Sequence, residues 1–161
     1  LDVLLKAWRK ASVDLPDYQL AVVGDVMSTP YGRECRRIAP DRTVFLGLQH
    51  ARRLAELYSN AALVVQPSVL EGMSLVLLEA AAYGRCIVAT KIPENTTMLG
   101  DSGVYFQGDN IAELAGLIRR YLKCKPERLS LGARAKRAVA AKLSWMEIAS
   151  GMESVYNRAL E

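Results

Sequence analysis

Short apolar segments alternate with helical segments along nearly the whole chain. Segments rich in β-branched residues, bounded by Gly, Pro, Asp or Asn, predict strands at 19–23, 43–46, 62–66, 86–89 and 103–106. Helices are predicted at 2–12, 31–38, 50–58, 74–83, 111–122, 127–142 and 145–160. Because strands separated by helices usually pair in parallel, this order predicts an α/β fold with a parallel sheet and helices on both faces.

The length fits one domain spanning residues 1–161, since 161 residues of which 51% are hydrophobic can bury a core on both sides of a sheet. Residues 123–127, which include Pro126, are the expected connector to the last helices. Residues 1–10 already form an amphipathic helix with no strand before it. We therefore expect the first strand of the fold to be missing from this chain.

The loop after the third predicted strand has the features of a ligand site. Pro67, Ser68 and Gly72 interrupt the pattern, and Ser74 is placed to cap the helix that follows. The N–H groups of this helix start, which carries partial positive charge, suit the phosphates or oxygens of an anionic ligand.

Two carboxylates flank this helix start. Glu71 can accept hydrogen bonds from neighbouring sugar hydroxyls just beyond a bound phosphate. Glu79 would lie at most about 12 Å further along the helix axis, so it suits a second diol on one extended ligand, such as the ribose of a sugar nucleotide. Either glutamate alone is explained by the helix dipole or by a solvated helix face, but together they favour a site.

The segment PSVLEGMSLVLLEAAAYGRCIVAT, residues 67–90, resembles the signature of family 4 retaining glycosyltransferases. Their carboxyl-terminal domain is the Rossmann-like, donor-binding half of the GT-B fold. Further segments similar to the family lie at 17–25, 44–47, 57–61, 92–95, 103–106 and 144–156, so the resemblance covers nearly the whole chain.

The resemblance implies a role for each matching residue. Glu71 would position the sugar, add a nearby negative charge and act as the catalytic residue, and Glu79 would bind the ribose. The remaining donor-binding residues would contact sugar, diphosphate and base mainly through the backbone: Gly24, Asp25, Leu46, Gly47, Leu48, Gly72, Met73, Ser74 and Leu75. Ligands of open α/β sheets do lie beyond the carboxyl ends of the strands, where all of these residues are expected. For Gly24, an ordinary strand-ending turn explains the glycine equally well.

The implied reaction is transfer of a hexosyl group from a UDP- or GDP-sugar to a hydroxyl of a glycan or lipid-linked acceptor, as in polysaccharide biosynthesis, with retention at the anomeric carbon. No clustered carboxylates or histidines suggest a metal, so metal-independent catalysis is expected. The family's amino-terminal domain binds the acceptor, and the Arg and Lys that hold the donor diphosphate belong to the missing first strand. This chain alone is therefore expected to be inactive.

Other classes remain open. A different GT-B enzyme, such as a sugar-nucleotide epimerase, a phosphorylase or a glycogen-synthase-like transferase, has the same fold. A non-catalytic nucleotide-binding or interaction module would have the fold with damaged site loops. The apparently intact sequence from Glu71 to Glu79 favours the family 4 transferase.

Composition narrows the setting. The net charge of +4 comes from Arg and Lys spread over helices, which favours solvated faces over contact with an anionic membrane surface. Aromatic residues are not interleaved with these basic residues, so the sequence does not suggest nucleic-acid binding. The three widely spaced cysteines argue for reduced thiols and a cytoplasmic protein, with the inner face of the membrane as an alternative location. His50 is expected to cap a helix or lie at the surface, and Glu94 and Asn95 to cap the helix near 96–99.

Overall fold

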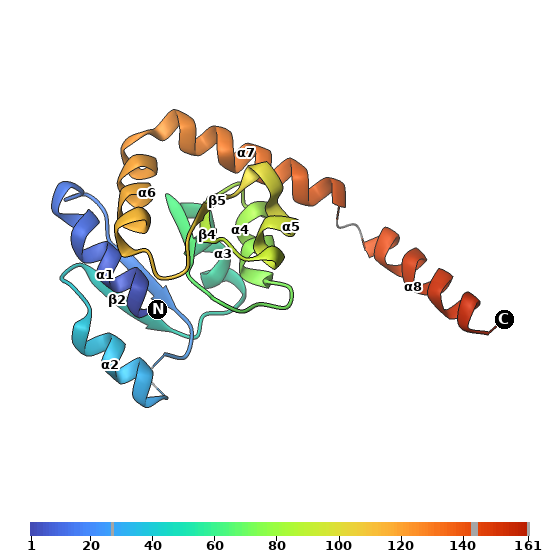
Figure 1. The fold of residues 1–161 in the computed structure, drawn as a ribbon, viewed down its shortest axis with the longest axis horizontal. Coiled ribbons are helices and arrows are strands. Elements are labelled where there is room, and N and C mark those ends of the chain that lie inside the picture. The colour runs from blue at the N-terminus through green and yellow to red at the C-terminus, as the bar shows by residue number, and fades with distance from the viewer. Residues whose placement is uncertain (27, 143–144, 161) are drawn as a thin grey trace.

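The computed structural model describes residues 1–26, 28–142 and 145–160, in which strands and helices alternate as predicted (Figure 1). The strands are β1 (Leu20–Val23), β2 (Thr43–Gly47), β3 (Leu63–Gln66), β4 (Cys86–Thr90) and β5 (Val104–Phe106). The α-helices are α1 (Asp2–Ala11), α2 (Pro30–Ile38), α3 (Ala51–Asn60), α4 (Leu75–Ala82), α5 (Pro93–Leu99), α6 (Ile111–Lys123), α7 (Lys125–Lys142) and α8 (Trp145–Ala159). Short 3₁₀ turns span Ser12–Asp14 and Gly100–Ser102.

All strand pairs in the described chain are parallel, as predicted, but they form two groups. β1 pairs with β2, while β3, β4 and β5 form a three-stranded sheet in that order. β1 and β3 therefore each have one edge without a strand partner among the described residues. This division differs from the continuous sheet expected from the sequence, because no described strand bridges β1 and β3.

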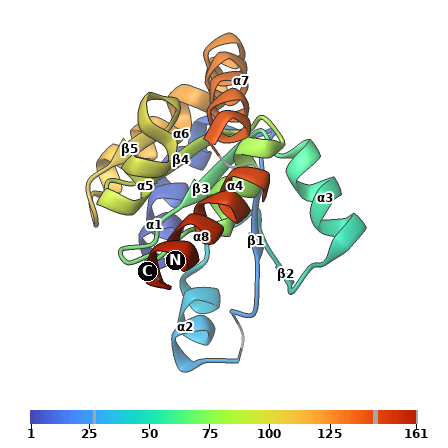
Figure 2. The same ribbon diagram turned by 90° about the vertical axis from the view of Figure 1, so that its right-hand side faces the viewer.

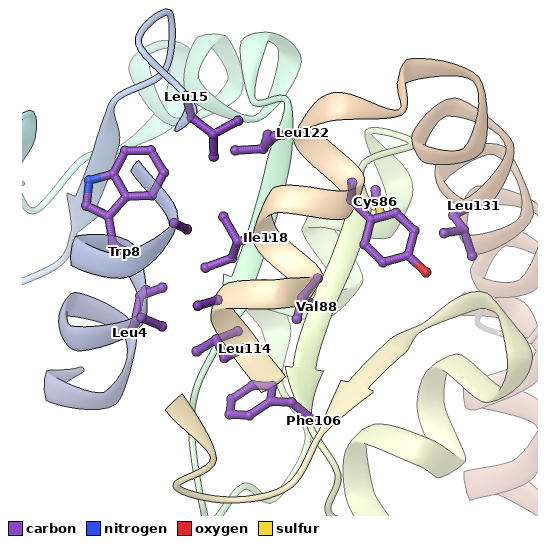
Figure 3. Packing of buried hydrophobic residues seen from close by; sticks show 14 residues of the cluster. Leu4, Trp8, Leu15, Cys86, Val88, Phe106, Leu114, Ile118, Leu122 and Leu131 are labelled. Carbon is purple, nitrogen blue, oxygen red and sulfur yellow. The ribbon is translucent and has the colours of Figure 1, made fainter. Parts of the chain in front are cut away.

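The core lies on both faces of β4, whose residues are all buried. On one face, Val88 packs with residues of α1 and α6 such as Leu4 and Ile118 (Figure 3). On the other face, Ile87 and Ala89 pack against α4 and the end of α5. Figure 2 shows the helices arranged around the central strands. The period-two alternation of β4 thus explains why helices cover both faces.

The expected connector at 123–127 is wrong. α6 ends at Lys123 and α7 begins at Lys125, so only Cys124 separates them. Pro126 falls in the first turn of α7, where a backbone N–H has no partner within the helix, and it therefore starts the helix without interrupting it.

α8 extends away from the rest of the molecule (Figure 1). Several of its apolar side chains are exposed, at 83% for Met146 and 61% for Tyr156. This helix therefore takes no part in the core described above.

Candidate functional site

Most predicted site residues lie at or just after the carboxyl ends of strands, as expected, while Leu75 and Glu79 lie in α4. Gly24 and Asp25 follow β1, Gly47 ends β2, and the loop containing Glu71 joins β3 to α4. This is the edge of a parallel sheet where loops and helix starts are free to meet a ligand.

The first group of site residues links the ends of β1 and β2. The Gly24 N–H donates to the Gly47 carbonyl at 2.9 Å, and both glycines have positive φ, +127° and +66°. A Cβ on either would meet no atom within 4 Å, so the surface above both is open. The carbonyl of Leu46 accepts a bond from Gln49 Nε2 at 2.6 Å, while Leu48 is 62% exposed.

Asp25 stabilises the turn after β1. Its Oδ1 accepts a hydrogen bond from the backbone N–H of Ser28 at 3.3 Å, and the residue is exposed. The structure thus gives Asp25 a local turn role that the sequence left unspecified.

The second group lies between β3 and α4 and contains Glu71. Gln66, the last residue of β3, donates through Nε2 to Glu71 Oε1 at 2.7 Å and to Ser68 Oγ at 3.0 Å. The Glu71 carboxylate is therefore held close to the end of β3.

The helix start beside Glu71 exposes donors. Among the described residues, no partner accepts a hydrogen bond from the backbone N–H groups of Gly72, Met73, Ser74 or Leu75. Free N–H groups at a helix start suit an anion. The prediction that the Ser74 side chain caps α4 is wrong, although Ser74 is the N-cap residue. Its Oγ is buried and has no hydrogen-bond partner in the described chain, because its side chain is turned into the protein.

Glu79 meets the neighbouring helix α3. The Tyr58 side chain lies close enough to the Glu79 carboxylate to interact with its charge, and its ring stacks on Tyr83, the residue that follows α4. Burial of Tyr58, together with its interaction with Glu79, raises the pKa of the phenol well above its usual range. The hydroxyl therefore stays protonated and is a donor beside Glu79.

A depression of about 530 Å³ lies on the α5 side of the same loop. It is lined by Gly72, Met73, Pro93, Glu94, Thr97, Met98 and Val139. Its lining is mostly apolar, with one carboxylate. The loop of the candidate site therefore forms part of a concave surface.

The expected helix cap after Pro93 is wrong. α5 begins at Pro93 with Ile92 as N-cap, and no side chain caps it. Asn95 is instead buried and donates to the Thr90 carbonyl at 2.9 Å, which ties α5 to the end of β4. His50 lies at the surface, as expected, and precedes α3 without a side-chain cap bond.

The cysteines and the possible metal ligands were compared with the sequence predictions. Cys35, Cys86 and Cys124 are free thiols, as expected. Within 1–26, 28–142 and 145–160, no three His, Cys, Asp or Glu residues gather in a way that could hold a metal ion. The described helices also include none that is long and apolar enough to cross a membrane.

Sequence reasoning missed Gln66 and Tyr58. Gln66 had a visible signal, an amide at the end of the apolar run Leu63 to Val65, five residues before Glu71. Tyr58 gave none, because only the packing of α3 against α4 brings it to Glu79.

The fold of this chain matches those of several solved structures. Sucrose-phosphate synthase from Thermosynechococcus elongatus matches with a TM-score of 0.81 and 28% identity, over 97% of this chain and 42% of that one. HepE from Anabaena, solved with UDP and glucose, matches with a TM-score of 0.86 and 19% identity, over 97% of this chain and 44% of that one. The chain therefore has the fold of a carboxyl-terminal GT-B domain, as the sequence predicted.

Sequence comparison identifies the family. The model for glycosyl transferases group 1 matches residues 1–124, and the chain belongs to this family. A D-inositol 3-phosphate glycosyltransferase from Geodermatophilus obscurus is 32% identical over 99% of this chain and 38% of its own length. The one from Corynebacterium aurimucosum is 29% identical over 99% and 40%. This chain thus spans well under half the length of these relatives.

Proposed function

We propose that this domain binds a nucleotide diphosphate sugar and that its full-length protein transfers the hexosyl group with retention at the anomeric carbon. One observation carries the proposal: the Glu71 carboxylate is held by Gln66 next to the free backbone N–H groups that begin α4. Negative and positive potential thus adjoin at one strand end, where a sugar and a diphosphate could be bound side by side.

The charges fit the chemistry of glycosyl transfer. In the transition state, positive charge develops on the sugar ring and negative charge on the leaving diphosphate. The start of α4 would stabilise the leaving group through its N–H groups and dipole. Glu71 would orient the sugar hydroxyls and place a negative charge near the ring, without forming a covalent bond.

The nucleotide would extend from α4 toward the other strand ends. Glu79 would accept hydrogen bonds from the ribose hydroxyls, with the Tyr58 hydroxyl beside its carboxylate. Gly24 and Gly47 leave open surface for phosphate and base. The structure of HepE with UDP and glucose supports a UDP-sugar as the first donor to test, with GDP-sugars as the alternative. We propose that donor binding needs no divalent metal. Added EDTA should therefore leave the Kd of the donor unchanged.

The full-length protein would complete the site. We propose that residues 1–161 form the donor-binding domain, that a preceding strand pairs between β1 and β3, and that an amino-terminal domain binds the acceptor. The unpartnered edges of these strands and the exposed apolar face of α8 support this arrangement. Three points stay predictions: a glycan or lipid-linked acceptor, an active site in the cytoplasm, and contact with the inner membrane face.

Isothermal titration of the full-length protein tests donor binding. UDP, GDP and their hexose conjugates are the probes, and Glu79→Ala is compared with wild type. Selective binding of one nucleotide, weakened about tenfold or more by the substitution, supports the proposal. NMR of the product then reports whether the anomeric configuration is retained. Absence of binding to every probe would instead favour an interaction module.

A further inference from the structure

Gln66 occupies an unusual position at the end of β3. Its backbone pairs with Ala89 of the buried strand β4, and its carbonyl accepts a bond from the buried Thr90 hydroxyl at 3.5 Å. From this anchored backbone, the side-chain amide donates both of its bonds into the following loop, to Ser68 and to Glu71. A rigid strand end is thereby connected directly to the carboxylate.

The loop itself gives Glu71 little support. Val69 and Leu70 are 73% and 84% exposed. In the part of the chain that the structure describes, Gln66 is the residue that donates to the Glu71 carboxylate, through Oε1, and Oε2 accepts no bond. The orientation of Glu71 therefore depends on one hydrogen bond from the sheet.

The chemical nature of the donor matters as much as its position. A charge-assisted bond to a carboxylate is short and directional, which agrees with the 2.7 Å separation. Lys or Arg in this position would fix Glu71 but also neutralise it. A neutral amide fixes Oε1 and leaves the negative charge, with Oε2 and the remaining lone pairs, available to hydroxyl donors.

We propose that Gln66 is a positioning residue that presets Glu71 for the hydroxyls of the donor sugar, and so controls recognition of the sugar separately from recognition of the nucleotide. This inference rests on the proposed function. Its physical basis is preorganisation: a carboxylate already held in place loses less side-chain freedom when the sugar binds.

The test measures sugar preference in the full-length protein. Titrations with UDP and UDP-glucose, and with GDP and GDP-mannose, give the ratio of the Kd of the nucleotide to that of its sugar conjugate. Gln66→Met keeps the length and volume of the side chain but removes the donor. We expect this ratio to fall about tenfold while the Kd of the bare nucleotide changes less than about twofold.

A matched control separates this effect from a general one. Gln19→Met makes the same exchange at an exposed residue just before β1, at the opposite end of the strands, and should leave both constants unchanged. Gln66→Asn keeps an amide but shortens its reach, and should behave like Gln66→Met. A normal sugar preference in Gln66→Asn would show that a polar strand end is sufficient, and would overturn the inference.

A double-mutant cycle shows whether Gln66 acts through Glu71. If it does, Gln66→Met adds nothing to the loss caused by Glu71→Ala, so the double variant matches Glu71→Ala alone. A full additional loss in the double variant contradicts the inference. The proposed function still stands in that case, provided that the wild-type protein binds the sugar conjugate more tightly than the bare nucleotide. If wild type binds neither nucleotide nor conjugate, the proposed function fails first and the inference fails with it.

Discussion

The ring of Tyr58 on α3 stacks on the ring of Tyr83, the residue that follows α4, with centroids 5.5 Å apart and 14° between the ring planes. The Tyr58 hydroxyl also interacts with the charge of Glu79, four residues before Tyr83. α3 therefore places a hydroxyl beside the second carboxylate of the candidate site, while an amide from β3 holds the first.

Tyr58→Phe should weaken nucleotide binding with little effect on folding. The substitution keeps the stacked ring but removes the donor to Glu79, so we expect about a threefold to tenfold rise in the Kd of UDP or GDP, measured by titration. Tyr83→Phe, which leaves the Tyr58 hydroxyl beside Glu79 in place, is the control and should bind normally. Equal losses in both variants would mean that the weaker binding does not come from the loss of the Tyr58 hydroxyl beside Glu79.

Gly24→Ala should reduce nucleotide affinity beyond its effect on stability. At φ +127°, an alanine is strained, at a cost of about 1–3 kcal/mol, and its Cβ projects into the open surface proposed for the phosphates. Gly100→Ala is the control, because Gly100 also has positive φ and open space but lies after α5. Titration and urea unfolding should show loss of stability in both variants and loss of binding only in Gly24→Ala.

Gly132→Ala should destabilise the domain. A Cβ on Gly132 of α7 would lie 2.1 Å from the carbonyl oxygen of Gly84, in the turn after α4, and backbone must move to admit it. We expect a loss of about 1–3 kcal/mol in the free energy of unfolding, measured with urea. Gly116→Ala, in an exposed and open part of α6, should instead stabilise by about 0.5–1 kcal/mol. Unchanged stability in Gly132→Ala would disprove this close approach.

Alkaline pH should destabilise the fold partly through Cys86. Burial raises the pKa of this thiol from its ordinary value of 9.0 to about 12. Below pH 9 both folded and unfolded states hold the proton; between pH 9 and about 12 only the unfolded state releases it, so stability falls with rising pH.

Cys86→Ala isolates that contribution. Between pH 7.5 and pH 10, wild type should lose on the order of 1 kcal/mol more free energy of unfolding than the variant loses. Parallel urea titrations at both pH values give the difference. An identical pH dependence in the two proteins would show that the thiol does not contribute.

Much of the fold could be predicted from local pattern. β4 was recognisable from Cys86 to Ala89 as a short apolar run between turns, and α6 from its apolar period beginning at Ile111. The ends of the helices were harder to predict. Pro126 suggested a connector but lies in the first turn of α7, because proline is also tolerated in the first turn of a helix.

The sequence by itself determined the strand–loop–helix unit that carries Glu71 and Glu79, because apolar runs and helix-start residues are local signals. Only the tertiary structure decided which side chains hold these carboxylates. Gln66 reaches Glu71 because the loop folds back on the end of β3, and Tyr58 reaches Glu79 because α3 lies beside α4. Ser74 was predicted to cap but is buried, since packing around α4 outweighs its local capping preference. Such contacts depend on the relative placement of whole elements, which residue spacing along the chain does not encode.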